Sequence, residues 1–306
     1  MNWLKLREAI VPDAHPTVVP PKIKLPVLPT VVLQFAKLAE DPDAAPKELG
    51  QIIETDSTLT CELLRYSNSS AFATRQKVAN PQQAITRIGI RAAKMFLLST
   101  AVQQTMKASK SKLINIQNLW LTNLERALFA REIARKLRAD ADLAYSGSLL
   151  QDFLLPVLSN EMFDEYFQYL QSFDDGRTTL TDFELQHFGW DHTLATAQVL
   201  QGWGFPPELV CCVRLHHRGL AALDDQEIGK SAAAAIAVAA LMPDPMRQSP
   251  RGLEQLMSLD EIWPQFQLAE TAASVDEQLK ELTPLAASHA TLARRLEKHC
   301  APAALG

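Results

Sequence analysis

Four side chains of this chain have the types that bind divalent metal ions: the carboxylate of Asp152 and the imidazoles of His192, His216 and His217. Carboxylate oxygens and neutral imidazole nitrogens are common ligands of zinc, iron and manganese. His192 is predicted to start one helix, and His216-His217 to end another. The four residues can therefore converge although they are far apart in the sequence, and together they could hold one metal ion.

The same side chains have a simpler interpretation, as buried groups that hydrogen-bond to one another. Asp152 lies in a very apolar stretch, and a buried carboxylate must be paired or hydrogen-bonded. His192 or His216 can supply that partner. Neighbouring residues of an α-helix point about 100° apart, so we expect only one of His216 and His217 to face a pocket. A structural contact between Asp152 and a histidine is the favoured interpretation.

The composition indicates a helical globular protein. The chain has 306 residues, enough for two domains or for one large domain with two lobes. Its 11 glycines are few for this length, and alanine and leucine are abundant, which favours helices. The net charge of -5 gives no general attraction for nucleic acids or anionic membranes. We therefore expect neither as a partner.

Targeting and cysteine patterns favour a cytoplasmic protein. No secretory signal is found at the N-terminus, and no stretch approaches the ~20 apolar residues that span a bilayer. The alanine-rich run at residues 231–242 is too short and is predicted to be a buried helix. The four cysteines form no CxxC pair, which argues against a thiolate zinc site and favours reduced thiols.

Helical periodicity predicts an all-α fold in two lobes. A proline-rich lead-in and an N-terminal helical lobe are assigned to residues 1–110, and a second helical lobe with C-terminal helices to residues 111–306. A short basic stretch marks the boundary. The predicted helices cover residues 30–39, 46–54, 58–68, 81–88, 90–106, 119–137, 143–158, 163–173, 182–188, 192–202, 206–217, 230–241, 253–257, 260–266 and 286–299.

Short motifs in both lobes carry a family resemblance. They include Ser67-Asn68-Ser69, Ile88-Gly89-Ile90, Leu119-Trp120, Gln151-Asp152, Trp203-Gly204-Phe205-Pro206 and His216-His217. Together they resemble the HDOD family, a bacterial signalling module related to the HD and HD-GYP metal phosphohydrolases, over roughly residues 22–240. The resemblance implies an all-α protein in which an N-terminal helical lobe packs on an HD-like helical lobe.

The resemblance also implies where a catalytic metal site would lie, and this chain departs from it at three positions. Thr122 stands near the place of the first histidine ligand, and Gln151 replaces the histidine of the His-Asp pair. The helix at 230–242 has no acid to close the site. The resulting vestigial site is Thr122, Gln151, Asp152, His192, His216 and His217. No metal or cofactor is expected; a metal, if bound, would use Asp152, His192, His216 and His217.

From these departures we expect a pseudoenzyme: a non-catalytic bacterial signalling module that acts through contacts with other signalling proteins. A small-molecule ligand in a cleft is also considered, with Ser67, Asn68 and Ser69 as the candidate groove. The main alternative is a divergent metal-dependent phosphohydrolase or phosphodiesterase acting on nucleotides or cyclic dinucleotides. A nucleic-acid regulator is a third hypothesis, against which the acidic charge argues.

Overall fold

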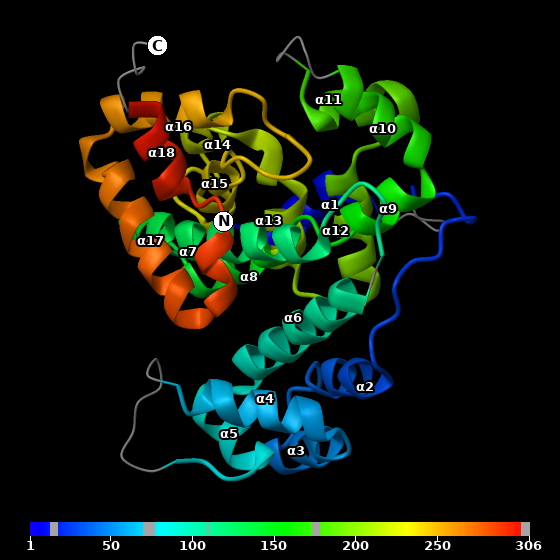
Figure 1. The fold of residues 1–306 in the computed structure, drawn as a ribbon. Helices are drawn as coiled ribbons and strands as arrows, with labels where there is room; N and C mark the ends of the chain where they lie inside the picture. Colours follow the sequence, from blue (N-terminus) through cyan, green and yellow to red (C-terminus); the bar gives the residue numbers. More distant parts are fainter. Residues whose placement is uncertain (13–17, 70–76, 109, 173–177, 301–306) are drawn as a thin grey trace. The chain divides into compact units, whose positions relative to one another are not determined.

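The regular structure is helical throughout the part of the chain that the structure describes. The computed structural model describes residues 1–12, 18–69, 77–108, 110–172 and 178–300, and within them it contains no strand (Figure 1). The predicted all-α fold class is confirmed. None of the described helices is long and apolar enough to cross a lipid bilayer.

The helices form two compact units. The small unit consists of residues 25–108 and 200–205, and the large unit of residues 1–24, 109–199 and 206–306. The large unit is therefore assembled from three separate stretches of chain. All of the candidate metal ligands belong to it.

The small unit is built from helices whose ends follow local sequence signals. Its helices are α2 (Thr30–Leu38), α3 (Pro46–Glu54), α4 (Ser57–Ser67), α5 (Pro81–Ile88) and α6 (Ile90–Ala108). Asp56 caps α4 by accepting hydrogen bonds from the backbone of Thr58 and Leu59. Asn80 caps α5 in the same way, and Gly89 ends it with a positive φ of 86°. These starts and stops agree with the sequence prediction.

The large unit surrounds the long helix α7. Its helices are α1 (Trp3–Ile10), α7 (Ile116–Leu137), α8 (Ala141–Leu150), α9 (Leu155–Glu161), α10 (Phe163–Gln171), α11 (Leu180–Phe188), α12 (His192–Gly202, whose last turn belongs to the small unit), α13 (Pro207–Arg214), α14 (Ala221–Asp224), α15 (Ala232–Ala239), α16 (Gly252–Ile262), α17 (Leu268–Leu282) and α18 (Leu292–Cys300). Short 3₁₀ helices cover His216–Arg218, Pro264–Phe266 and Pro284–Ser288. Helices α8, α15 and α17 pack against α7. Every residue of α15 is buried, as predicted for this alanine-rich run.

One predicted helix is broken at Asp152, one of the candidate metal ligands. The sequence predicted a continuous helix over residues 143–158, but α8 ends at Leu150 and α9 begins at Leu155. Pro156 explains the break, because proline has no backbone N–H and its ring clashes with the carbonyl four residues earlier. Asp152 consequently lies in the turn between the two helices rather than on a helix face.

Three helices of the large unit, α1, α14 and α17, were not predicted. The N-terminal helix α1 packs on α13 although none of its residues is fully buried. Helix α17 buries Leu268, Ala272, Val275 and Leu279, whose spacing is that of one helical face. This periodicity was present in the sequence but was not used in the prediction.

Candidate functional site

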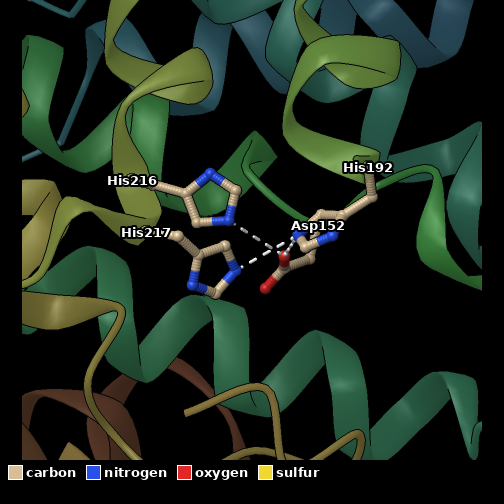
Figure 2. A group of neighbouring side chains, drawn as sticks. All are labelled: Asp152, His192, His216 and His217. Carbon is tan, nitrogen blue, oxygen red and sulfur yellow. Dashed lines mark hydrogen bonds and ion pairs between the residues drawn. The ribbon is translucent and has the colours of Figure 1, made fainter. Parts of the chain in front are cut away.

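Asp152, His192, His216 and His217 converge in the large unit. Each offers one ligand atom, and these four atoms all lie within 4.8 Å of one another (Figure 2). Oδ1 of Asp152 is 3.6 Å from Nε2 of His192 and 3.5 Å from Nε2 of His216. Nε2 of His217 is 3.2 Å from Nε2 of His192. The chain thus brings one carboxylate and three imidazoles from three segments to one point.

Both adjacent histidines face Asp152, so the expectation that only one of them would do so was wrong. The predicted helix over residues 206–217 ends earlier, at Arg214, and a 3₁₀ helix over His216–Arg218 follows. The α-helix therefore ends before the histidines, and the geometry of a continuous α-helix does not apply to them. In Figure 2 both imidazole rings point toward the carboxylate.

Two of the imidazoles are held in place by hydrogen bonds at Nδ1, the ring nitrogen that lies away from Asp152. Nδ1 of His192 lies 2.7 Å from Oε2 of Glu184, and Nδ1 of His216 lies 2.6 Å from the carbonyl oxygen of Val213. Tyr166 in turn donates a hydrogen bond of 2.7 Å to Oε1 of Glu184. These contacts direct Nε2 of both rings toward Asp152. The same arrangement orients histidine ligands in metal sites.

An arginine of α7, Arg126, is fully buried beside Asp152. Nη1 of Arg126 lies 2.9 Å from Oδ2 of Asp152, and Nη2 lies 3.0 Å from Oδ2 of Asp244. Nη2 also donates to the carbonyl oxygens of Ala240 and Met242. Arg126 follows Thr122 by one helical turn on α7, so both residues lie on the face that carries the vestigial site. This spacing was the sequence signal that could have identified it.

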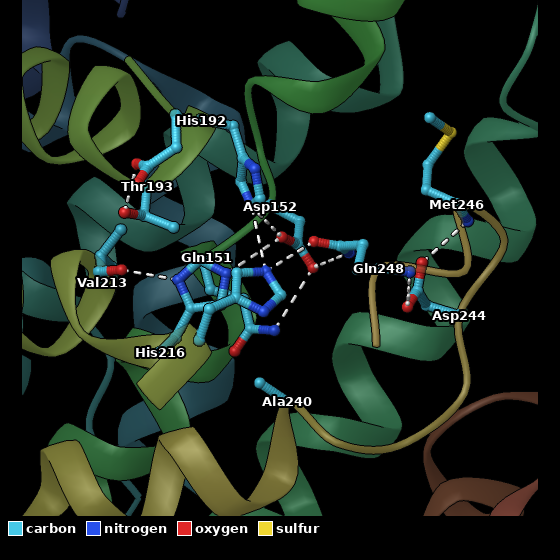
Figure 3. A network of polar contacts seen from close by, with 12 residues as sticks. Gln151, Asp152, His192, Thr193, Val213, His216, Ala240, Asp244, Met246 and Gln248 are labelled. Atoms are coloured by element: carbon cyan, nitrogen blue, oxygen red, sulfur yellow. Dashed lines mark hydrogen bonds and ion pairs between the residues drawn. The ribbon is translucent and has the colours of Figure 1, made fainter. Parts of the chain in front are cut away.

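Residues 243–251, the later part of the connection between α15 and α16, form a loop that supplies two side chains to the site (Figure 3). Asp244 pairs with Arg126. Gln248 donates from Nε2 to Oδ2 of Asp152 at 3.1 Å, and its Oε1 lies 2.9 Å from Nε2 of His217. The helix predicted over 230–242 has no acid, and the second carboxylate beside Arg126 comes from the loop that follows it.

The two oxygens of Asp152 have different surroundings. Oδ2 accepts hydrogen bonds from Arg126, Gln248 and Gln151, the last at 3.3 Å. Oδ1 has no hydrogen-bond partner, and neither has Nε2 of His216, although both atoms are buried. The predicted contact between Asp152 and a histidine is therefore present at ion-pair distance but not as a hydrogen bond.

The pKa values of the site follow from burial and from these neighbours. Burial raises the pKa of Asp152, but His192, His216 and Arg126 outweigh it and hold that pKa well below the usual value. Burial lowers the pKa of His192, but Glu184 and Asp152 raise it to about 10. Burial, His216 and His192 all lower the pKa of His217. At neutral pH the site therefore holds a carboxylate, an imidazolium and a neutral imidazole.

The donor set of the site fits one metal ion. Oδ1 of Asp152 and Nε2 of His216 are buried without partners, and the two rings that are held at Nδ1 direct Nε2 toward the same point. Two features oppose an ion. Nε2 of His217 already contacts Gln248, and Arg126 already compensates the charge of Asp152. Among the described residues, this is the one cluster with at least three such ligands.

The other predicted site residues have structural surroundings. Thr122 is buried on α7. The candidate groove lies in the small unit, where Ser67 donates a hydrogen bond to the carbonyl oxygen of Leu64. The side-chain amide of Asn68 pairs with both backbone groups of Val78, at 3.0 Å and 2.9 Å. The backbone of Ser69 donates to that of Tyr66. These contacts stabilise the end of α4.

The sequence of this chain was compared with models of known protein families. The model of the HDOD domain matches residues 25–219. The chain belongs to the HDOD family. The match ends before Asp244 and Gln248, so the loop that completes the site lies outside the matched range of this HDOD protein.

Three solved structures share the fold of this HDOD protein. A Geobacter sulfurreducens HDOD domain protein of unknown function has a TM-score of 0.55 and 20% identity, over 83% of this chain and 93% of that chain. A Shewanella amazonensis protein described as a candidate phosphohydrolase has a TM-score of 0.56 and 18% identity, over 90% and 91%. A Marinobacter aquaeolei protein described as a candidate signal transduction protein has a TM-score of 0.55 and 18% identity, over 86% and 59%. At these identities the likeness concerns the fold.

A curated relative is longer than this chain. It is an uncharacterized protein of Treponema pallidum, 24% identical over 198 residues, which are 63% of this chain and 37% of the relative. The chain thus spans little more than a third of that protein.

Proposed function

We propose that this HDOD protein is a non-catalytic regulatory module that acts through contacts with other signalling proteins. The observation that carries the proposal is the position of Arg126, whose guanidinium pairs with Asp152 and Asp244 inside the site. A metal-dependent hydrolase needs uncompensated carboxylate charge to attract its cation. Here the guanidinium of Arg126 supplies the compensating charge, and it also repels a metal ion from Oδ2 of Asp152.

Two further features support the absence of hydrolysis. Gln151 and Thr122 offer no charged ligand at the positions where the resemblance implies histidines. In addition, the side chains of Asp152, His192 and His216 have no surface exposed to solvent. A phosphate ester cannot reach the carboxylate unless the surrounding chain moves.

The proposal is tested by metal content and turnover measured on one preparation. Protein purified without chelator is analysed for zinc, iron and manganese, then assayed with added Mn²⁺ against nucleotide monoesters and cyclic dinucleotides. We expect no turnover above that of a matched His192→Ala protein. Hydrolysis that disappears in His192→Ala would overturn the proposal, whatever the metal content.

A second candidate function is a divergent phosphohydrolase with one metal ion. It is favoured by the two unpartnered buried atoms, Oδ1 of Asp152 and Nε2 of His216. Asp152 and the three histidines would hold the ion, which would supply an acidified water. This candidate requires turnover that rises with bound metal and that is lost in Asp152→Asn.

A further inference from the structure

The 243–251 loop is folded by its own aspartate before it meets the site. Oδ1 of Asp244 accepts a hydrogen bond of 2.8 Å from the backbone of Met246, and Oδ2 accepts one of 3.1 Å from the backbone of Gln248. Between them, Arg247 has a φ of 52°, in the left-handed region that a residue with a side chain rarely adopts. The segment from Asp244 to Gln248 is therefore a tight turn, and Gln248 lies at its end.

The side chain of Gln248 contacts two of the four candidate metal ligands. Gln248 is fully buried, and its amide joins Asp152 to His217. The Nε2 group of the amide donates to the carboxylate, so its Oε1 faces His217 as an acceptor. His217 must then carry its hydrogen on Nε2, and that nitrogen has no lone pair left for a metal ion. Gln248 and a metal ion compete for the same atom.

We propose that Gln248 is an internal plug and that binding of one divalent transition-metal ion releases it, so that the ion acts as a signal. The ion takes Oδ1 of Asp152 and Nε2 of the three histidines. His192 releases its Nε2 proton to solvent, and His217 carries its hydrogen on Nδ1 instead of Nε2 and gives up its contact with Gln248. This inference deepens the proposed regulatory function and rests on it, since it assigns the ion a regulatory and not a catalytic role.

The loop is connected to the helices beside the site, which gives the switch an output. The backbone carbonyl of Gln248 accepts a hydrogen bond of 3.1 Å from the backbone of Leu180, at the start of α11. The carbonyl of Arg247 accepts one of 2.8 Å from the hydroxyl of Tyr169, on α10. Release of the loop removes both contacts. The α10–α11 pair carries the exposed apolar side chains of Phe167 and Leu185, so a change there is a change of surface.

Thermodynamic linkage relates the contacts of Gln248 to the affinity of the site for a metal ion. If an ion weakens the plug, the plug must weaken binding of the ion by the same factor. Loss of the two hydrogen bonds of the Gln248 side chain should therefore tighten metal binding by roughly tenfold. A purely structural glutamine would leave affinity unchanged or reduce it, because its loss would loosen the ligands.

The first experiment is a titration with Co²⁺, followed by visible absorption of the bound ion. We expect wild-type protein to bind one ion and Gln248→Ala to bind it roughly tenfold more tightly. Gln226→Ala, which removes an exposed glutamine of the same unit, should match wild type. Gln248→Leu keeps the volume without the hydrogen bonds and replaces the alanine variant if that protein does not fold. Equal or weaker binding by the Gln248 variants overturns the inference.

The second experiment measures amide hydrogen exchange of wild-type protein with and without Zn²⁺. Faster exchange in the 243–251 loop and in the first turn of α11 on addition of Zn²⁺ supports the switch. Unchanged exchange there at saturating Zn²⁺ overturns it. Neither result depends on turnover, so the inference can fail while the non-catalytic assignment stands. Hydrolysis by the loaded protein would overturn that assignment independently.

Discussion

Nη1 of Arg126 lies 2.9 Å from Oδ2 of Asp152, and neither side chain is exposed to solvent. A second carboxylate, that of Asp244, completes the pairing from the far end of the guanidinium. Removing three charges from water costs free energy that their mutual attraction repays only when the geometry is good. The contacts therefore specify one arrangement of α7, the α8–α9 turn and the 243–251 loop more than they add to net stability.

Replacing Arg126 by methionine should destabilise the protein by about 3–5 kcal/mol, because two carboxylates remain buried without their cation. Urea denaturation followed by circular dichroism measures the change. Arg135→Met is the matched control, since Arg135 lies on the same helix and forms an exposed pair with Glu132. Such surface pairs contribute about 0–1 kcal/mol.

The same destabilisation should be partly reversed by neutralising the carboxylates. Adding Asp152→Asn and Asp244→Asn to Arg126→Met removes the unpaired charges, so the triple variant should be more stable than Arg126→Met alone. If the triple variant is less stable than that single variant, burial of unpaired charge is not the cause of the loss.

Glu184→Gln should lower stability at pH 7 by about 1.5–3 kcal/mol, because Glu184 accepts hydrogen bonds from the backbone and from the ring of His192. The comparison is made by denaturation against Glu165→Gln, which removes an exposed carboxylate of α10. Equal stability of the two variants would show that Glu184 does not anchor His192.

Asp276 should contribute stability that is lost in acid. Burial raises its pKa, but Lys280 and its other polar neighbours together outweigh this, so the pKa in the folded protein lies below its usual value of 3.8. A lowered pKa stabilises the folded state above the unfolded pKa, and the contribution disappears as pH falls through the folded pKa. The stability difference between wild type and Asp276→Asn should therefore be full at pH 6 and shrink below pH 3.8. Asp164→Asn, at an exposed position, controls for the loss of one charge.

The cysteines should differ sharply in reactivity. Burial raises the pKa of Cys211 to about 12 and that of Cys212 well above its usual value, whereas Cys61 is exposed. Because the thiolate is the reactive form, iodoacetamide at pH 8 should modify Cys61 and spare the adjacent pair until urea is added. Peptide mapping by mass spectrometry reads the sites. Modification of Cys211 in the folded protein would contradict the packing of α1 against α13.

Much of the fold could be predicted because helix signals are local. Asp56, Asn80 and Gly89 mark helix ends through their own backbone neighbours, and these ends were predicted correctly. Helix α17 was missed although its apolar spacing is regular. The break before α9 was missed because Pro156 was read as part of one long apolar run. Each of these errors could have been avoided from the sequence.

The centre of the site could be predicted only in part. Asp152 and the histidines follow from residue type and from the family resemblance. The contacts of Arg126, Asp244 and Gln248 depend on which distant segments the fold brings together, and no local pattern specifies them. For Arg126, the one-turn spacing from Thr122 indicates the helix face on which it lies, but not the residues with which it pairs. Arg126 is fully buried, although charged side chains usually lie on the exposed face of a helix.

The discontinuity of the large unit has a consequence for synthesis on the ribosome. The small unit needs little beyond residue 108, whereas the large unit draws on segments up to the C-terminal helices. Arg126 and Asp152 are translated well before Asp244, so the guanidinium cannot complete its pairing until the 243–251 loop emerges. The small unit can fold during translation. The polar centre of the large unit cannot be completed before its last members have been synthesised.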